Sequence, residues 1–97
     1  MKKLLPIGSV VLLNDSDKKL MITGRLQREA NDKNQTQWDY SACLYPQGHL
    51  SQESTLLFNQ EQIERVYFIG FQDTEGLEYN EKISEYLNRK ISKLRLW

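Results

Sequence analysis

The chain has 97 residues, enough for one domain with a single core, and its 13 basic and 13 acidic residues cancel to a net charge of zero. A neutral chain has no overall field that draws it to nucleic acid or to an anionic membrane, so both partner classes are disfavoured. The single cysteine, Cys43, cannot form an internal disulfide, which fits a reducing compartment.

The N-terminal residues imitate a secretory signal, because two lysines precede an apolar run over residues 4–13. Pro6 and Gly8 interrupt this run, and no cleavage site of small residues follows it. The run is also much shorter than the roughly 20 residues that span a bilayer. We therefore expect a cytoplasmic protein that has no membrane partner.

The first half of the chain predicts short strands joined by polar turns. Residues 9–13 are β-branched and aliphatic, and residues 18–27 alternate imperfectly around Gly24, which indicates a β-bulge or a close backbone approach. Residues 28–37 are almost entirely polar and predict the exposed tip of a hairpin. Residues 38–45 form the densest strand, with four side chains predicted to face inward: Trp38, Tyr40, Ala42 and Leu44.

Two further apolar runs follow the proline–glycine turn at residues 46–48. Residues 56–58 predict a short strand, after which Asn59 can cap a single helical turn. Residues 63–71 carry apolar side chains on both faces. This pattern predicts a strand that is central in the sheet or covered by a helix.

From Gln72 onward the apolar spacing becomes helical. Asp73 or Thr74 can cap the segment, acidic residues open it and basic residues close it, which is the order that the helix dipole favours. Four apolar side chains recur at intervals of four, four and three: Ile83, Leu87, Ile91 and Leu94. The pattern predicts an amphipathic helix over about residues 74–95.

The whole chain, residues 1–97, is therefore predicted to be one α+β domain with a β-rich part at residues 5–71 and a C-terminal amphipathic helix. The sheet is expected to be bent and antiparallel, or a small SH3-like open barrel, with four to five strands. A flat sheet with a helix is the alternative.

Residues that carry catalysis are scarce. A metal site needs three or four converging ligands, whereas the chain has one histidine, His49, and one cysteine, Cys43. A buried thiol and a solvated turn histidine explain this pair better than a nucleophilic site does. Asp73, Glu75 and Glu78 fit the first turn of a helix better than an acid/base cluster. No glycine motif for phosphate is present, so we expect neither an enzyme nor a cofactor.

Aromatic residues offer two binding hypotheses. Four of them, near Arg25 and Lys19, resemble a stacking face for single-stranded nucleic acid, although the neutral charge argues against it: Tyr40, Tyr45, Tyr67 and Phe71. Apolar anchors for a protein partner are the favoured interpretation, and the candidates are Phe71, Tyr86, Leu94 and Trp97.

Four blocks of the chain, taken in order, resemble a known family. They are LPIGSVVLL, KKLMITGR, DYSACLYPQGH and LFNQEQIERVYFIGFQDTEG, at residues 5–13, 18–25, 39–49 and 57–76. The set is similar to small domain-of-unknown-function proteins of Gram-positive bacteria, encoded beside type VII (ESX/Ess) secretion loci and LXG-type toxins. The resemblance leaves out the hairpin tip and the distal helix.

The resemblance implies a non-enzymatic accessory, an adaptor or targeting chaperone that binds the N-terminal region of an LXG toxin, or its small helical partner proteins, before export. It assigns no catalytic or binding residues. An export signal, tyrosine followed four residues later by Asp or Glu, is absent, since Tyr79 leads to Ile83 and Tyr86 to Lys90. Two other functions stay open, a toxin immunity protein and a small barrel that binds single-stranded nucleic acid, and so does a homodimer.

Overall fold

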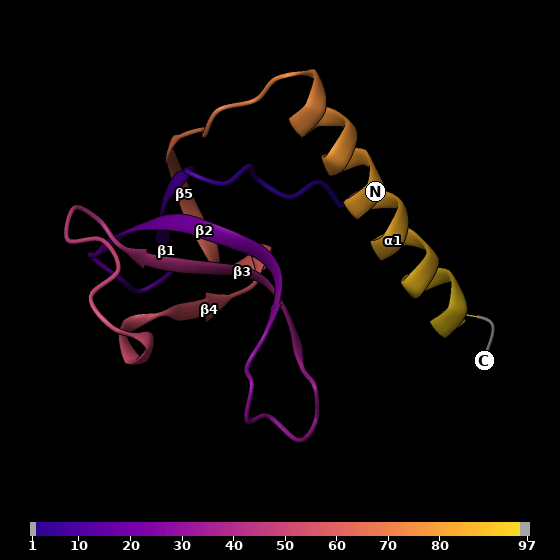
Figure 1. Ribbon diagram of the computed structural model, residues 1–97, viewed down its shortest axis with the longest axis horizontal. Coiled ribbons are helices and arrows are strands. Elements are labelled where there is room, and N and C mark those ends of the chain that lie inside the picture. The colour runs from indigo at the N-terminus through magenta and orange to yellow at the C-terminus, as the bar shows by residue number, and fades with distance from the viewer. Residues whose placement is uncertain (1, 96–97) are drawn as a thin grey trace.

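The computed structural model describes the backbone of residues 2–95 and the side chains of residues 2–90. Five strands form one open antiparallel sheet in the order β4-β3-β2-β1-β5, and a long helix follows them (Figure 1), so the predicted α+β fold is confirmed. The elements are β1 (Val10–Leu13), β2 (Lys19–Arg28), β3 (Gln37–Leu44), β4 (Leu56–Phe58), β5 (Ile63–Phe68) and α1 (Thr74–Arg95), with short 3-10 turns η1 (Gln52–Ser54) and η2 (Gln60–Gln62).

The β2–β3 hairpin bends where the bulge was predicted. Ile22 pairs with Ala42 and Gly24 with Ser41, so one extra residue lies in β2 between the two pairs. A Cβ atom at Gly24 would lie only 2.7 Å from Ser41 Oγ, which explains why this position carries no side chain. The bulge curves both strands around the core.

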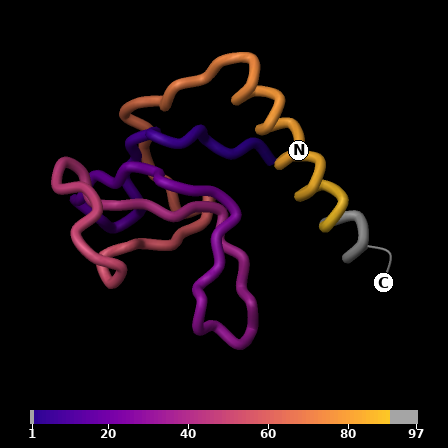
Figure 2. The backbone as a smooth tube through the Cα atoms, in the orientation of Figure 1, coloured from indigo at the N-terminus to yellow at the C-terminus, as the bar shows by residue number. Residues whose placement is uncertain are grey.

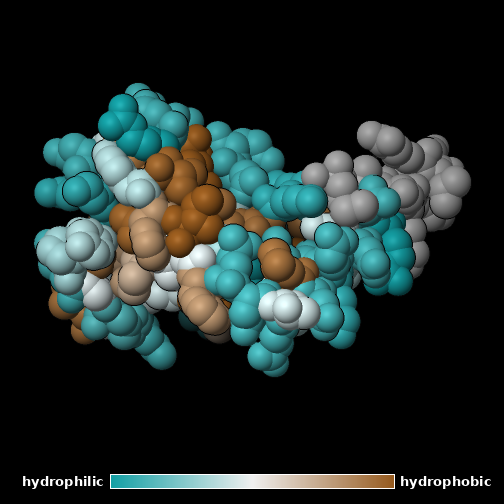
Figure 3. Space-filling model, turned by 90° about the horizontal axis from the view of Figure 1, so that it is seen from above, coloured by the Kyte–Doolittle hydropathy of each residue, from teal (hydrophilic) through white to brown (hydrophobic). Residues whose placement is uncertain are grey.

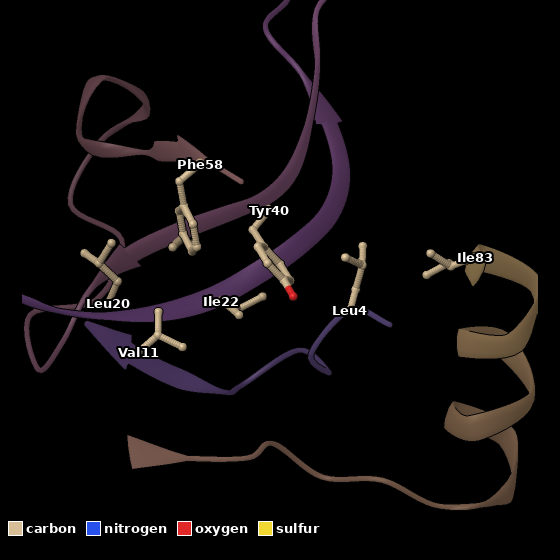
Figure 4. Close-up of a cluster of buried hydrophobic side chains, with 8 residues drawn as sticks. Leu4, Val11, Leu20, Ile22, Tyr40, Phe58 and Ile83 are labelled. Atoms are coloured by element: carbon tan, nitrogen blue, oxygen red, sulfur yellow. The ribbon is translucent and has the colours of Figure 1, made fainter. Parts of the chain in front are cut away.

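The core lies on the concave side of the sheet (Figure 4). Tyr40 and Phe58 pack with their ring centroids 5.2 Å apart. Of the side chains predicted to face inward from β3, Tyr40 and Ala42 are buried, while Trp38 and Leu44 are half-buried. The buried cluster consists of Leu4, Val11, Leu20, Ile22, Tyr40, Ala42, Phe58 and Ile83.

Residues 2–6, which we call the N-terminal strap, run between the sheet and α1 (Figure 2). Side chains from both sides bond the strap backbone: Ser84 to Lys2 O (3.1 Å), Gln60 to Lys3 O (2.8 Å), Asn80 to Leu4 O (3.1 Å), and Tyr40 Oη to Leu5 N (2.7 Å). Leu4 also joins the buried cluster next to Ile83 (Figure 4). The helix therefore docks on the strap instead of lying across a face of the sheet.

The prediction that residues 63–71 form a central or helix-covered strand is wrong. β5 is the edge strand, it pairs only with β1, and residues 64–68 are all exposed. α1 is held beside the sheet by the strap (Figure 1), so it leaves β5 uncovered. Apolar side chains on both faces of a strand indicate that it favours burial, but they do not specify whether its own chain supplies the cover.

Candidate functional site

Exposed apolar side chains continue from β5 into the start of α1. Phe71 is 82% exposed and Phe68 60% exposed. Figure 3, which looks down on this side of the molecule, shows a broad hydrophobic area among polar surroundings. We use the name apolar belt for the exposed large apolar side chains of residues 66–77, which are Val66, Tyr67, Phe68, Ile69, Phe71 and Leu77.

Gly70 holds the belt in place. Its N–H donates to Ser9 Oγ at 3.0 Å, and Ser9 Oγ in turn donates to Pro6 O at 2.8 Å. A Cβ atom at Gly70 would lie 2.1 Å from Ile7 O, so the two backbones are in direct contact. This contact fixes the chain on both sides of Gly70, and Ile69 and Phe71 are therefore presented outward from a defined point.

A hollow of about 560 Å³ lies between the strap and the start of α1. Its apolar lining comes from strap and belt together: Leu4, Leu5, Pro6, Ile69 and Leu77. Phe71 lines a neighbouring hollow of about 250 Å³, which shares Pro6, Gln72 and Asn80 with the larger one. The belt therefore lies next to two concave surfaces, and an apolar side chain of a partner is best buried in such a pocket.

The start of α1 is acidic for a structural reason. Asp73 Oδ1 accepts a hydrogen bond of 2.9 Å from Gly76 N, so Asp73 is the N-cap, as one of the two caps predicted. Glu75 lies in the first turn, where the helix dipole favours a carboxylate. Asp73 and Glu75 therefore stabilise the N-terminus of α1.

Tyr40 is the buried polar centre behind the strap. Its hydroxyl accepts from Leu5 N and donates to Gln60 Oε1. Burial raises the pKa of Tyr40 to about 12. A phenol held protonated in this way is a fixed hydrogen-bonding group at neutral pH and no proton carrier.

Lys2 ties the strap to the β3 side of the sheet. Its Nζ atom lies 2.7 Å from Asp39 Oδ2 and 2.9 Å from Glu61 Oε1. Burial by itself lowers the pKa of Lys2, but the hydrogen bonds to Asp39 and Glu61 outweigh it, so the pKa of Lys2 is raised overall. The hydrogen bond from Lys2 also lowers the pKa of Glu61. Lys2 and Glu61 therefore stay charged at neutral pH, and the ion pairs that Lys2 makes stabilise the strap.

The catalytic candidates do not form a site. Cys43 is buried, His49 is exposed, and no hydrogen bond joins them among the residues that the structure describes. The same part of the chain holds no group of three His, Cys, Asp or Glu side chains placed to bind a metal ion. No described helix has both the length and the apolarity to cross a membrane.

The four predicted protein-binding residues have different outcomes. Phe71 belongs to the apolar belt. Tyr86 is 39% exposed and lines another hollow with Arg28, Arg89 and Lys90, so the two aromatic residues do not share one site. The side chain of Leu94 and all of Trp97 lie outside the described residues. Phe68 and Ile69 were missed, although the apolar side chains on both faces of their strand were a signal.

The aromatic face suggested for nucleic acid is divided in the structure. Tyr40 is buried in the core. Tyr45, Tyr67 and Lys19 line one hollow on the outer face of the sheet, whereas Arg25 and Phe71 line another beside α1. A single stacking track through all of these residues is therefore absent from the described chain.

The fold and its surface define a small α+β protein whose main candidate site is an uncovered apolar belt. A family model described as a domain of unknown function, DUF4176, matches residues 4–79, and the chain belongs to this family. The matched segment contains all five strands, the strap from Leu4 onward and the first turns of α1. No curated protein and no solved structure gives a significant match.

Proposed function

We propose that this protein is a non-enzymatic, protein-binding accessory that acts as an adaptor or targeting chaperone for type VII secretion of LXG-type toxins. The apolar belt is the observation that carries the proposal. The similarity of the four sequence blocks to proteins encoded beside type VII secretion loci supports the secretion context.

The belt supports protein binding because the backbone conformation around Gly70 holds its side chains in exposed positions. Soluble chains rarely expose several large apolar side chains together unless a partner covers them. Here the belt residues flank Gly70, whose backbone is bonded to Ser9 and touches Ile7, so Ile69 and Phe71 cannot turn inward without breaking that contact. The belt is therefore set up to be covered from outside.

The hollows beside the belt suit a helical partner. A groove between the strap and α1 with a rim of Glu78, Glu81 and Lys3 matches an amphipathic helix that presents apolar side chains to it. The N-terminal region of an LXG toxin and its small partner proteins are expected to supply such helices. An adaptor of this kind acts in the cytoplasm, where it shields the apolar face of its partner until export.

An immunity protein would use the same belt on a different part of the toxin. Both functions can be separated by co-expressing the tagged protein with an LXG toxin divided into its N-terminal region and its toxic domain, and by measuring which fragment co-purifies. Recovery of the N-terminal region or of the small helical proteins supports the adaptor. Recovery of the toxic domain, with loss of toxicity, establishes immunity instead.

Two single variants test whether the belt is the binding surface. Phe71→Asp places a charge on the belt, whereas Leu50→Asp makes the same change at a residue that is 65% exposed outside the belt. We expect Phe71→Asp to reduce fragment capture at least tenfold and Leu50→Asp to leave it unchanged, with both variants folded by circular dichroism. Equal capture by both would remove the belt from the proposal.

A further inference from the structure

The outer edge of β5 is open for strand pairing. β5 is bonded on one side to β1 and ends the sheet on the other. Among the described residues, no backbone hydrogen bond outside the β1–β5 ladder involves residues 64–68. Such an edge offers unpaired N–H and C=O groups to an extended segment of another chain.

The register of the sheet places an apolar row next to this edge. Phe68 pairs with Val10, Val10 with Met21, and Met21 with Cys43, so the four side chains share the outer face. A register shift inserts Tyr67 between Phe68 and Val66, and both aromatic rings line a hollow of about 430 Å³ on this face. Tyr45 lines the same hollow from the turn after β3.

A cationic row runs beside the apolar one. Arg65 pairs with Leu12 and Leu12 with Lys19, which puts both cations on the outer face. Lys19 Nζ lies 5.1 Å and Arg65 Cζ 5.7 Å from the centroid of the Tyr67 ring. Neither cation has a carboxylate partner within the described part of the chain, where Lys2 makes the ion pairs. An anion near Tyr67 would relieve their mutual repulsion.

We propose that β5 binds an extended acidic segment of a partner protein by strand addition, with an apolar side chain beside Phe68 and an Asp or Glu beside Arg65. On the inner edge, Phe68 and Arg65 pair with Val10 and Leu12, which are two residues apart because Tyr67 is an extra residue. We expect a strand added on the outer edge to keep this spacing. The recognised pattern is therefore apolar-x-acidic. This inference rests on the proposed protein-binding function and names a second contact of the same partner.

Charge selects this occupant over a second copy of the chain. Two β5 strands paired about a two-fold axis would keep Arg65 and Lys19 of both copies on one face of the joined sheet. Four cations would then gather near the junction, and within the described residues neither Arg65 nor Lys19 forms an ion pair with a carboxylate of its own chain, Glu64 included. An acidic strand removes that repulsion instead of doubling it.

The test uses a fluorescein-labelled peptide, TVTFTDTVT, and its lysine counterpart, TVTFTKTVT, with binding to the full chain followed by anisotropy at low salt. We expect the acidic peptide to bind at least tenfold more tightly than the lysine peptide. Arg65→Glu is expected to reverse this preference, whereas Lys33→Glu, the same change of charge at an exposed residue outside β5, keeps it. N-methylation of alternate residues should abolish binding, because it removes the backbone donors that strand addition uses.

The outcomes that would overturn the strand-addition inference are the following. Equal binding of the two peptides, or an unchanged preference in Arg65→Glu, would show that there is no charge contact. A β5-dependent dimer, detected by light scattering, would make a second copy of the chain the occupant. Tighter binding of a poly-dT strand would make nucleic acid the ligand. Toxin-fragment capture that survives Arg65→Glu but is lost in Phe71→Asp refutes the strand addition and leaves the adaptor proposal standing. Peptide binding as expected without any fragment capture refutes the adaptor alone.

Discussion

The close approach of Gly70 to the backbone of Ile7 gives the first stability prediction. In Gly70→Ala, the new Cβ atom would lie 2.1 Å from Ile7 O, 2.9 Å from Ile7 C and 3.0 Å from Ser9 N. Ordinary contact begins at 3.4 Å, so Ile7 O has to move by 3.4 − 2.1 = 1.3 Å. All three neighbours are backbone atoms, and none can rotate away as the end of a side chain would.

The expected cost has two parts. Overpacking of this kind costs about 1–3 kcal/mol. The shift also breaks the 3.0 Å hydrogen bond between Gly70 N and Ser9 Oγ, which contributes about 1 kcal/mol. We expect Gly70→Ala to lower the free energy of unfolding by about 2–4 kcal/mol, a large fraction of the roughly 5–15 kcal/mol that a domain possesses.

Urea unfolding followed by circular dichroism measures this loss. With a slope of about 2 kcal/mol per molar, the midpoint should fall by roughly 1–2 M while the slope stays constant. Gly76→Ala is the matched control, because its Cβ atom would meet Asp73 Oδ1 at an acceptable 3.4 Å inside α1. That variant should gain about 0.5–1 kcal/mol. A Gly70→Ala protein within about 0.5 kcal/mol of the parent would refute the argument that this contact fixes the belt.

Further predictions concern the strap. Tyr40→Phe deprives Leu5 N–H of its partner and should cost about 1–3 kcal/mol in the same urea assay. Burial raises the pKa of Tyr40 from 10.0 to about 12 in the folded state. The stability that the phenol contributes is therefore complete below pH 10 and is lost as pH rises through 12. The difference in unfolding free energy between the parent and Tyr40→Phe should shrink over that pH range, and a constant difference would contradict this argument. Asn80→Ala removes the 3.1 Å bond to Leu4 O and should speed amide exchange in α1, while Asn88→Ala, at an exposed position of the same helix, should not.

Several features of this protein are decided within a few residues of sequence, and these were predicted. Gly24 marks the bulge because a glycine inside an alternating run is unfavourable in a regular strand. Asp73 caps α1 because its carboxylate reaches an N–H three residues later. The period of two in β3 identifies Tyr40 and Ala42 as core residues, although Asp39, Ser41 and Cys43 on the other face are buried as well. Such signals are readable because both interacting groups, or the period that relates them, lie in one short segment.

The conformation of the strap and the position of β5 at the edge of the sheet could be learned only from the tertiary structure. The strap shows no strand or helix period, and side chains more than thirty residues away bond the backbone of residues 2–5: Tyr40, Gln60, Asn80 and Ser84. For β5, the sequence determined that its side chains are apolar, but not what covers them. Because the strap holds α1 beside the sheet, the strand that sequence patterning placed in the centre of the sheet or under a helix lies on the surface, and there it forms part of the candidate binding site.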